Sequence, residues 1–306
     1  MPLPTPLSGV VPPLCTPLTA AGDVDTRALA SLVDHLLTAG AHAVFALGTS
    51  GEAAFLSDDQ RRTAVRATVD AVAGRVPVLA GVIDMTTARV LDHARAARSL
   101  GVDGLVATAP FYTRPRPAET AAHFRRLRDD AGLPLIAYDI PSAVHSKLDA
   151  ATLLALAADG TLAGLKDSSG DGGALRRLLV ALRARGLGDT FSVLTGSELT
   201  VDAALLAGAH GVVPGLGNVD PAGYVRLYEH ARAGRWPEAA AEQDRLAALF
   251  ALTEAGGGAS PVGCFKAALR LLGVIDCPAT APPQVPLPDE AVASVRGLLA
   301  EGGLLR

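Results

Sequence analysis

The stretch LAGLKDSS at residues 162–169 is a short apolar run that ends in four polar residues, the first of which is Lys166. The run is too short for a helix of ordinary length and fits a buried strand. In α/β barrels the functional side chains follow the C-terminal ends of parallel strands. A polar cluster directly after an apolar run therefore predicts both a strand of such a fold and a place for chemistry.

Similar runs recur on both sides of this stretch, at a spacing of about 25 residues. They lie at residues 9–15, 43–47, 78–82, 104–107, 135–140, 162–166, 191–195 and 211–213. Amphipathic stretches of helical period separate them, for example residues 27–38, 58–72, 87–100 and 118–130. Eight strand–helix units favour a (β/α)₈ TIM barrel over an open doubly wound sheet, and no Gly-x-Gly-x-x-Gly follows the first run.

The C-terminal part of the chain has a different pattern. After residue 232 the apolar runs stop, and residues 235–254, 261–272 and 289–299 have the period of three further helices. The stretch Gly256–Gly258 and a proline-rich segment, residues 277–288, separate them. We expect a barrel over residues 1–232 and a three-helix extension of the same domain over residues 233–306.

The composition limits the classes of function. Of the 306 residues 49% are hydrophobic and 19% charged, which predicts a large core, and the net charge of −4 argues against nucleic-acid binding. The longest apolar stretches are too short to cross a bilayer, and residues 1–10 lack the features of a signal peptide. Three cysteines and seven histidines show no metal-site spacing. We expect a cytoplasmic enzyme without a metal, a membrane or a nucleic-acid partner.

Lys166 is the first candidate for catalysis. Burial at the end of an apolar strand favours the neutral amine, because desolvation penalises the charged form. A neutral amine can attack a carbonyl carbon and form an imine. The alternative is a lysine that reaches the rim of the barrel or pairs with Asp167, and position alone does not separate the two.

Tyr138 places one hydroxyl in the apolar run 135–140, one predicted strand from Lys166. It is either a core tyrosine with a satisfied hydroxyl or a proton carrier for an imine. After the second run, the loop GTSGE at residues 48–52 places Thr49 and Ser50 between two glycines. Such a loop can form an anion-binding nest, although the pattern is also common in ordinary loops. We interpret Glu52 as a structural residue that ties the loop to the barrel.

Other predicted strands also end in candidate residues. Tyr112 follows the fourth run between prolines, where exposed aromatic side chains serve as interface anchors or pocket walls. The seventh run leads into Gly196 and Glu198, and the eighth ends at Val213. These positions would meet Lys166 at one end of a barrel.

In this order the segments resemble the dihydrodipicolinate synthase / N-acetylneuraminate lyase family. The resemblance covers essentially the whole chain, from GVVPPLCTPL at residues 9–18 to the helical tail. It implies a homotetramer, a dimer of dimers, of (β/α)₈ barrels that hold pyruvate as a Schiff base on a lysine, without a separate cofactor. It also implies a 2-oxo acid or pyruvate and an aldehyde as small-molecule partners.

The family's motifs can be carried over residue by residue. The imine lysine falls on Lys166 in GLKD, and the proton-relay tyrosine on Tyr138 in AYDIP. The tyrosine that reaches across a dimer interface to complete a Tyr–Thr–Tyr relay falls on Tyr112. The resemblance thus implies Lys166, Tyr138, Thr49 and Tyr112 as catalytic residues, and Thr49, Ser50, Ser168, Gly196, Glu198 and Val213 as substrate-binding residues.

Two features bear on the substrate. In the lysine-biosynthesis synthases an arginine after the Pro-Ser of the fifth strand grips the carboxylate of aspartate semialdehyde, and Ala143 stands at that position here. Loss of a bidentate carboxylate partner costs about 2–3 kcal/mol of binding. Glu198 lies near a position where neuraminate-lyase relatives carry an acidic residue that binds sugar hydroxyls. His145 or Lys147 could replace the arginine, which keeps the synthase open.

The expected function is therefore a Schiff-base-forming carbon–carbon lyase or synthase that uses or releases pyruvate. The main reading is an aldolase of a 2-keto-3-deoxy sugar acid or a similar 2-oxo acid. The alternative is dihydrodipicolinate (4-hydroxy-tetrahydrodipicolinate) synthase, which condenses pyruvate with aspartate semialdehyde. A dehydratase, and a non-catalytic barrel that only binds pyruvate, are lesser alternatives.

Overall fold

The computed structural model describes residues 2–257 and 261–305 and has eight parallel strands in one sheet. The strand order is β1-β8-β7-β6-β5-β4-β3-β2, the circular order of a (β/α)₈ barrel, and this confirms the predicted fold. The strands are β1 Gly9–Val10, β2 Val44–Ala46, β3 Val78–Gly81, β4 Gly104–Thr108, β5 Leu135–Asp139, β6 Gly164–Asp167, β7 Ser192–Thr195 and β8 Gly211–Val212.

The seam between β1 and β2 closes the barrel without a regular ladder. The His42 N–H donates to the Val10 carbonyl at 2.9 Å, and the Phe45 N–H donates to the Pro12 carbonyl at 3.0 Å. The first strand was predicted to run to residue 15 but ends at Val10. Residues 12 and 13 are both prolines and have no N–H to donate, so the chain can pair with β2 only through isolated bonds.

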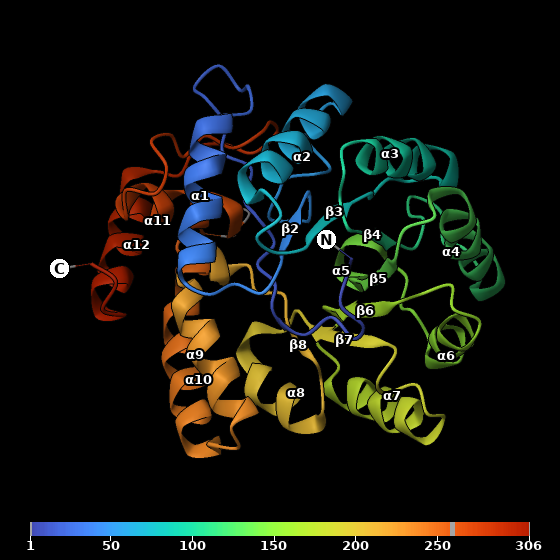
Figure 1. The fold of residues 1–306 in the computed structure, drawn as a ribbon. Helices are drawn as coiled ribbons and strands as arrows, with labels where there is room; N and C mark the ends of the chain where they lie inside the picture. Colours follow the sequence, from blue (N-terminus) through green and yellow to red (C-terminus); the bar gives the residue numbers. More distant parts are fainter. Residues whose placement is uncertain (1, 258–260, 306) are drawn as a thin grey trace.

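The barrel helices surround the sheet on the outside (Figure 1). They are α1 Thr26–Thr38, α2 Asp58–Val72, α3 Thr87–Ser99, α4 Pro117–Ala131, α6 Ala150–Ala158, α7 Gly172–Ala184, α8 Val201–Ala207 and α9 Pro221–Arg232, with a short extra helix α5 at Pro141–Val144. The helices expected at residues 27–38, 58–72, 87–100 and 118–130 are present, with ends that differ by one residue at most.

Three more helices follow α9 and lie together at one side of the barrel (Figure 1). They are α10 Trp236–Phe250, α11 Pro261–Leu271 and α12 Asp289–Glu301, and a 3-10 turn, η3 Ala251–Glu254, extends α10. Gly258, in the predicted glycine break, lies outside the described residues. The division into barrel and extension at residue 232 stays a prediction.

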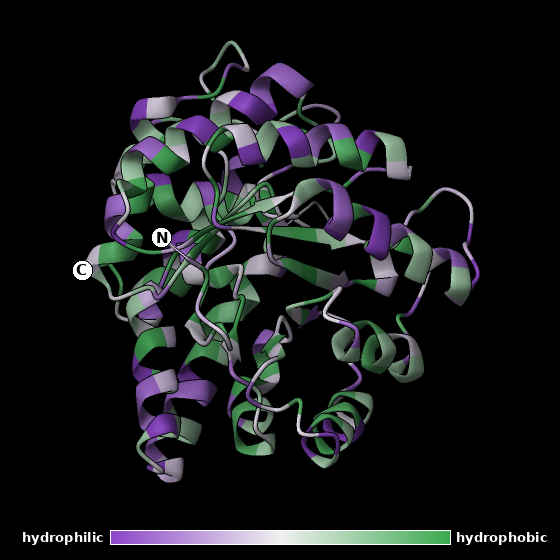
Figure 2. Ribbon diagram, turned by 45° about the vertical axis from the view of Figure 1, so that its right-hand side comes forward, coloured by the Kyte–Doolittle hydropathy of each residue, from purple (hydrophilic) through white to green (hydrophobic). Residues whose placement is uncertain are grey.

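The strands are buried on both faces, so their residues alternate between two cores. Leu105 and Leu135 pack between the barrel and the helices, whereas Val106 and Ile136 point into the barrel. Figure 2 shows the strands as mainly hydrophobic and the outer helices as mixed. Because alternate residues share a face, Tyr138 points into the barrel like Ile136, two residues before it.

Candidate active site

Lys166 and Tyr138 are direct partners in the pairing of β6 with β5. Residues in register on neighbouring parallel strands point to the same face, which is the barrel interior here. Lys166 is only 4% exposed, and its Nζ lies 3.9 Å from the centre of the Tyr138 ring and 5.1 Å from that of Phe45. The structure therefore places the predicted imine lysine beside the predicted relay tyrosine, inside the barrel.

The Tyr138 hydroxyl also contacts the loop after β2. Thr49 Oγ1 and Tyr138 Oη share a hydrogen bond of 3.2 Å. Burial by itself would raise the pKa of Tyr138, but the charge of Lys166 and hydrogen bonds with Thr49, Lys166 and Ser168 lower it overall. A phenol in this setting can give up and regain a proton more easily than an ordinary tyrosine.

A cavity of about 170 Å³ opens at this point, at the C-terminal ends of the strands. Every predicted site residue except Tyr112 lines it. The lining residues are Pro13, Thr49, Ser50, Tyr138, Lys166, Ser168, Gly196, Glu198, Val213, Gly215, Phe250, Thr253, Pro261, Val262 and Phe265. The volume suits a small organic acid rather than a cofactor.

Gly196 is required by close packing against Ser168. A Cβ atom at position 196 would lie 2.0 Å from the Ser168 hydroxyl oxygen and 3.4 Å from the Lys166 side chain. Any other residue would displace the Ser168 hydroxyl. The substrate-binding role of both residues stays a prediction, and their position in the cavity is consistent with it.

Glu198 lines the cavity, but protein donors already bind its carboxylate. The Gly215 N–H, the Leu216 N–H and the Tyr224 hydroxyl donate to it at 2.8, 3.0 and 2.6 Å. Burial raises the pKa of Glu198 to about 7, although these hydrogen bonds oppose the shift. Glu198 thus fixes the loop after β8, and its predicted contact with sugar hydroxyls has to use the acceptor capacity that remains.

Glu52 was expected to tie its loop to the barrel, but its side chain binds the C-terminal extension instead. Its carboxylate forms an ion pair with Lys266 of α11 and accepts hydrogen bonds from the Ala281 N–H at 2.6 Å and Gln284 Nε2 at 2.8 Å. A fully buried carboxylate needs a cation and donors, and the C-terminal extension supplies them all. The expectation of a structural residue holds, but its partner was wrong.

Tyr112 lies apart from the other candidates in the single chain. It is 91% exposed and is not among the residues that line the cavity. Its φ angle of 81° is in the left-handed region, which costs a non-glycine residue on the order of 1–3 kcal/mol. An exposed aromatic side chain held in a strained conformation is not explained by packing within this chain.

Position 143, where the resemblance implies an arginine in the lysine-biosynthesis synthases, follows the fifth strand. Ala143 is exposed in α5. Lys147, a candidate replacement, is already paired with the buried Asp139, and its Nζ lies 4.0 Å from Asp167. Neither Lys147 nor His145 lines the cavity, and Lys166 is the sole cationic side chain among the described residues that do.

The cavity wall from the C-terminal extension was not predicted. Phe250 and Thr253 come from the end of α10 and from η3, and Val262 and Phe265 come from α11. In the sequence these residues have the spacing of an ordinary core-facing helix. A periodic pattern reports which face is buried, but not whether that face meets a core or a cavity.

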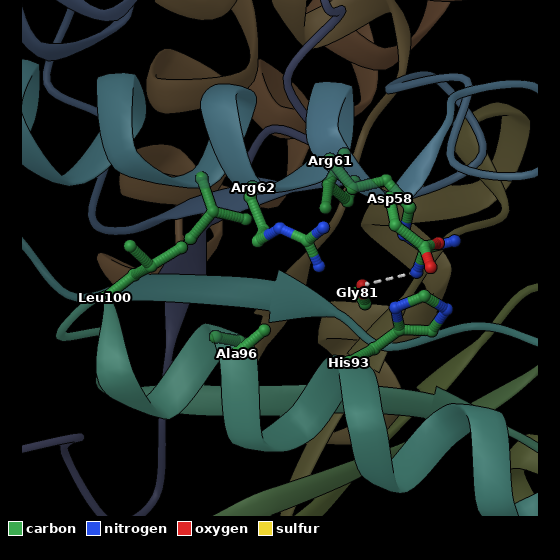
Figure 3. Close-up of a pocket in the computed structure, with 10 residues that line it drawn as sticks. Asp58, Arg61, Arg62, Gly81, His93, Ala96 and Leu100 are labelled. Carbon is green, nitrogen blue, oxygen red and sulfur yellow. Dashed lines mark hydrogen bonds between the residues drawn. The ribbon is translucent and has the colours of Figure 1, made fainter.

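A second pocket, between α2, α3 and β3, is shown in Figure 3. Its volume of about 20 Å³ is enough for about one water molecule. The buried Arg61 reaches from α2 to the carbonyls of Gly81 at 3.4 Å and Ala53 at 3.0 Å (Figure 3 shows the first). Arg61 therefore holds the chain just after the candidate-site loop, and the small pocket is a packing feature.

Residues 2–257 and 261–305 contain no candidate metal site and no candidate membrane span. No group of three or more His, Cys, Asp or Glu side chains in these residues is placed to hold a metal ion. No helix in the same part of the chain is long and apolar enough to span a bilayer. The three cysteines are free, and burial raises the pKa of the Cys15 thiol to about 12.

Residues 6–301 match the Dihydrodipicolinate synthetase family. The chain belongs to this family. A 4-hydroxy-tetrahydrodipicolinate synthase of Kineococcus radiotolerans is 35% identical over 98% of this chain and 94% of its own. An uncharacterized DapA-like lyase of Halobacterium salinarum is 36% identical over 98% of this chain and 95% of its own.

Solved structures of the dihydrodipicolinate synthetase family have the same fold. YagE, a prophage protein of E. coli K12 in complex with pyruvate, superimposes with a TM-score of 0.91 at 28% identity, over 97% of this chain and 99% of its own. A monomeric dihydrodipicolinate synthase variant superimposes with a TM-score of 0.91 at 27% identity, over 98% of both chains. Members of the family are thus lyases or synthases that share this barrel, and one of them is seen with pyruvate.

Proposed function

We propose that this protein is a Schiff-base-forming lyase that makes or breaks a carbon–carbon bond next to pyruvate. The observation that carries the proposal is the buried Lys166 amine beside Tyr138, whose hydroxyl is bonded to Thr49, all in one small cavity. The pyruvate bound in a solved relative supports the choice of the 2-oxo acid. No separate cofactor is needed, because the iminium that Lys166 forms with the keto carbon itself accepts the electron pair.

The reaction would begin at Lys166. Its Nζ attacks the keto carbon, the keto oxygen takes up protons, and water leaves to give an iminium ion. Tyr138, with Thr49 beside it, passes the protons between the nitrogen and the departing oxygen. The Thr49–Ser50 loop would hold the substrate carboxylate through its hydroxyls and N–H groups.

Loss of a proton from C3 of the iminium gives an enamine, which adds to an aldehyde carbon and forms the new C3–C4 bond. In the cleavage direction the C4 hydroxyl gives up its proton, the C3–C4 bond breaks and its electron pair passes into the iminium, so that the aldehyde leaves and an enamine remains. C3 of the enamine then takes up a proton, which restores the iminium. Water then releases pyruvate from Lys166. The same groups serve both directions.

Borohydride trapping tests the imine directly. Reduction in the presence of pyruvate should label Lys166, and peptide mass spectrometry locates the label. The sequence has three lysines, so Lys147→Met should keep the label and Lys166→Ala should lose it. A label on another residue, or none in the wild-type protein, contradicts the mechanism. Label without turnover of any aldehyde would instead support the non-catalytic barrel.

Two aldehydes compete as the second substrate. The names of the relatives favour 4-hydroxy-tetrahydrodipicolinate synthase, and therefore aspartate semialdehyde, over the sugar-acid aldolase. The cavity favours an uncharged hydroxyaldehyde and a 2-keto-3-deoxy acid product, because Ala143 replaces the arginine and Lys147 is bound to Asp139. Because Lys166 is bonded to the first substrate during the reaction, no other described cationic side chain in the lining remains for a second carboxylate.

One panel separates these candidates. Pyruvate is offered with aspartate semialdehyde, glyceraldehyde and N-acetylmannosamine, and kcat/KM is measured for each. Synthase activity predicts the highest value with the semialdehyde, and aldolase activity predicts it with one of the two hydroxyaldehydes. A dehydratase would release water from a 2-keto-3-deoxy acid while condensing none of the three.

The proposal includes a homotetramer in the cytoplasm, in which Tyr112 of one subunit completes the relay of a partner. The exposure of Tyr112 and its left-handed φ angle support a role outside its own chain. Assembly differs within the family, since one solved relative is described as monomeric. The relay is therefore tested through Tyr112 itself rather than through the subunit count.

A further inference from the structure

We propose that the buried ion pair between Glu52 and Lys266 positions the pyruvate-binding loop against α11, which makes the C-terminal extension part of the active site. Glu52 and Lys266 would be positioning residues, because neither lines the cavity. The inference rests on the proposed function, since it assumes that Thr49 and Ser50 hold pyruvate. It assigns a role to the one ion pair among the described residues with both side chains fully buried.

Residues of the C-terminal extension supply the hydrogen-bond partners of the pair. Both side chains are 0% exposed. The other carboxylate oxygen of Glu52 accepts from the Ala281 N–H and from Gln284, and Lys266 Nζ donates to the Ala279 carbonyl at 2.7 Å. One carboxylate thus joins the loop after β2 both to α11 and to the segment that follows α11.

A backbone hydrogen bond within the loop links Glu52 to a residue that lines the cavity. The Glu52 N–H donates to the Thr49 carbonyl at 3.1 Å, so the anchored residue and the residue bonded to Tyr138 belong to one turn. Glu52 has a φ angle of 57°, a conformation that a non-glycine residue keeps only when its surroundings impose it. A shift of Glu52 would therefore move the Thr49 hydroxyl.

On the other side, the pair sets the position of an aromatic wall. Lys266 follows Phe265, which lines the cavity and packs close to Gly215 in the loop after β8. The ion pair therefore fixes the distance between the wall that binds the carboxylate and the wall that faces the rest of the substrate. Apolar side chains could fill the same volume, but they would not hold the loop in one direction as charged hydrogen bonds do.

A double variant separates an effect on the position of the loop from an effect on the stability of the fold. Glu52→Gln or Lys266→Met alone leaves one buried charge unpaired and should unfold at lower urea concentration. Glu52→Gln with Lys266→Met removes both charges and should recover most of that loss. If the pair positions the loop, the double variant still needs on the order of tenfold more pyruvate to half-saturate borohydride trapping of Lys166.

The expected signature is wild-type-like unfolding combined with weakened pyruvate trapping. A double variant that matches the wild type in both the urea midpoint and the half-saturating pyruvate concentration would overturn the inference. Because trapping needs no aldehyde, the measurement does not depend on which aldehyde is the substrate.

Gln284→Ala provides a milder variant that leaves both charges paired. Gln284 is partly exposed, so the fold should tolerate the change, while Glu52 loses one donor. Trapping should require about two- to tenfold more pyruvate. Gln60→Ala is the control, because it removes glutamine side-chain bonds to the Gly22 carbonyl and from the Ser57 N–H, neither of which involves the Glu52 cluster. Equal effects of the two variants on pyruvate trapping would contradict the inference.

Trapping in the wild-type protein distinguishes a failure of the proposed function from a failure of the positioning role. If pyruvate and borohydride leave wild-type Lys166 unmodified, the proposed function fails, whatever the variants do. If wild-type Lys166 is labelled and Gln284→Ala and the double variant trap pyruvate as the wild type does, the positioning role alone fails.

Discussion

Tyr138 and Lys166 face each other across the β5–β6 pairing, and the lysine nitrogen lies 3.9 Å from the centre of the tyrosine ring. This relationship follows from register rather than from loop conformation, so it is as rigid as the barrel itself. The Tyr138 hydroxyl also shares a hydrogen bond with Thr49. One tyrosine thus contacts both the proposed nucleophile and the loop proposed to bind the carboxylate.

Removal of the Tyr138 hydroxyl should separate imine formation from turnover. In Tyr138→Phe the ring still packs beside Lys166, but no hydroxyl carries protons, so kcat should fall by about 10²- to 10⁴-fold. Some borohydride trapping of pyruvate should persist. Tyr228→Phe is the control, because Tyr228 is also buried but packs against His42. Full activity in Tyr138→Phe would remove this residue from the relay.

The interface role of Tyr112 can be tested by mixing inactive subunits. Tyr112→Phe and Lys166→Ala should each lower turnover, and Tyr112→Phe should leave the fold unchanged, because Tyr112 is 91% exposed. A hybrid of the two variants contains one site with Lys166 that can receive Tyr112 from its partner. Turnover should reappear on mixing and refolding. If the hybrid stays inactive although mass spectrometry shows that it has formed, Tyr112 does not act across an interface.

Glu198 should make stability fall as the pH rises. Burial raises its pKa to about 7, from an ordinary value of 4.5, so between these values the folded state binds a proton that the unfolded state has lost. The stabilisation is complete below pH 4.5 and is lost as the pH rises through 7. Between pH 5 and 8, the wild type should lose up to about 3 kcal/mol of unfolding free energy relative to Glu198→Gln. Parallel profiles in urea titrations would contradict this assignment.

An arginine at position 143 should shift the choice of aldehyde. Ala143→Arg restores a side chain able to bind a carboxylate in two hydrogen bonds, so kcat/KM with aspartate semialdehyde should rise by about thirtyfold or more. Kinetics with glyceraldehyde should change little or worsen. Ala143→Gln is the neutral control of similar reach. A wild-type protein that already prefers the semialdehyde, and gains nothing from Ala143→Arg, would show that another group binds this carboxylate.

The sequence alone predicted much of the fold and of the site, because the signals were local. An apolar run of strand length reports burial, and its period of two decides which side chains share a face. Eight such runs predicted the barrel, and the rule that polar residues gather at the C-terminal ends of the strands selected Lys166, Tyr138 and Thr49. The structure brings these three together in one cavity.

Other features depended on contacts between residues far apart in the chain. Glu52 pairs with Lys266, more than two hundred positions away, and no local pattern marks either as a partner of the other. Lys147 was a candidate for binding a substrate carboxylate until the structure placed it against Asp139. A charged side chain gives its sign in the sequence, but its partner depends on which elements pack together.

By itself, then, the sequence determined the order of the strands and the residues at their ends, including Lys166 and Tyr138. Only the tertiary structure decided that Phe265 walls the cavity, that Glu198 is bound by Tyr224, and that Tyr112 stays outside. The physical reason is that backbone geometry fixes local periodicity, whereas burial and charge pairing are settled when distant segments exclude water from each other.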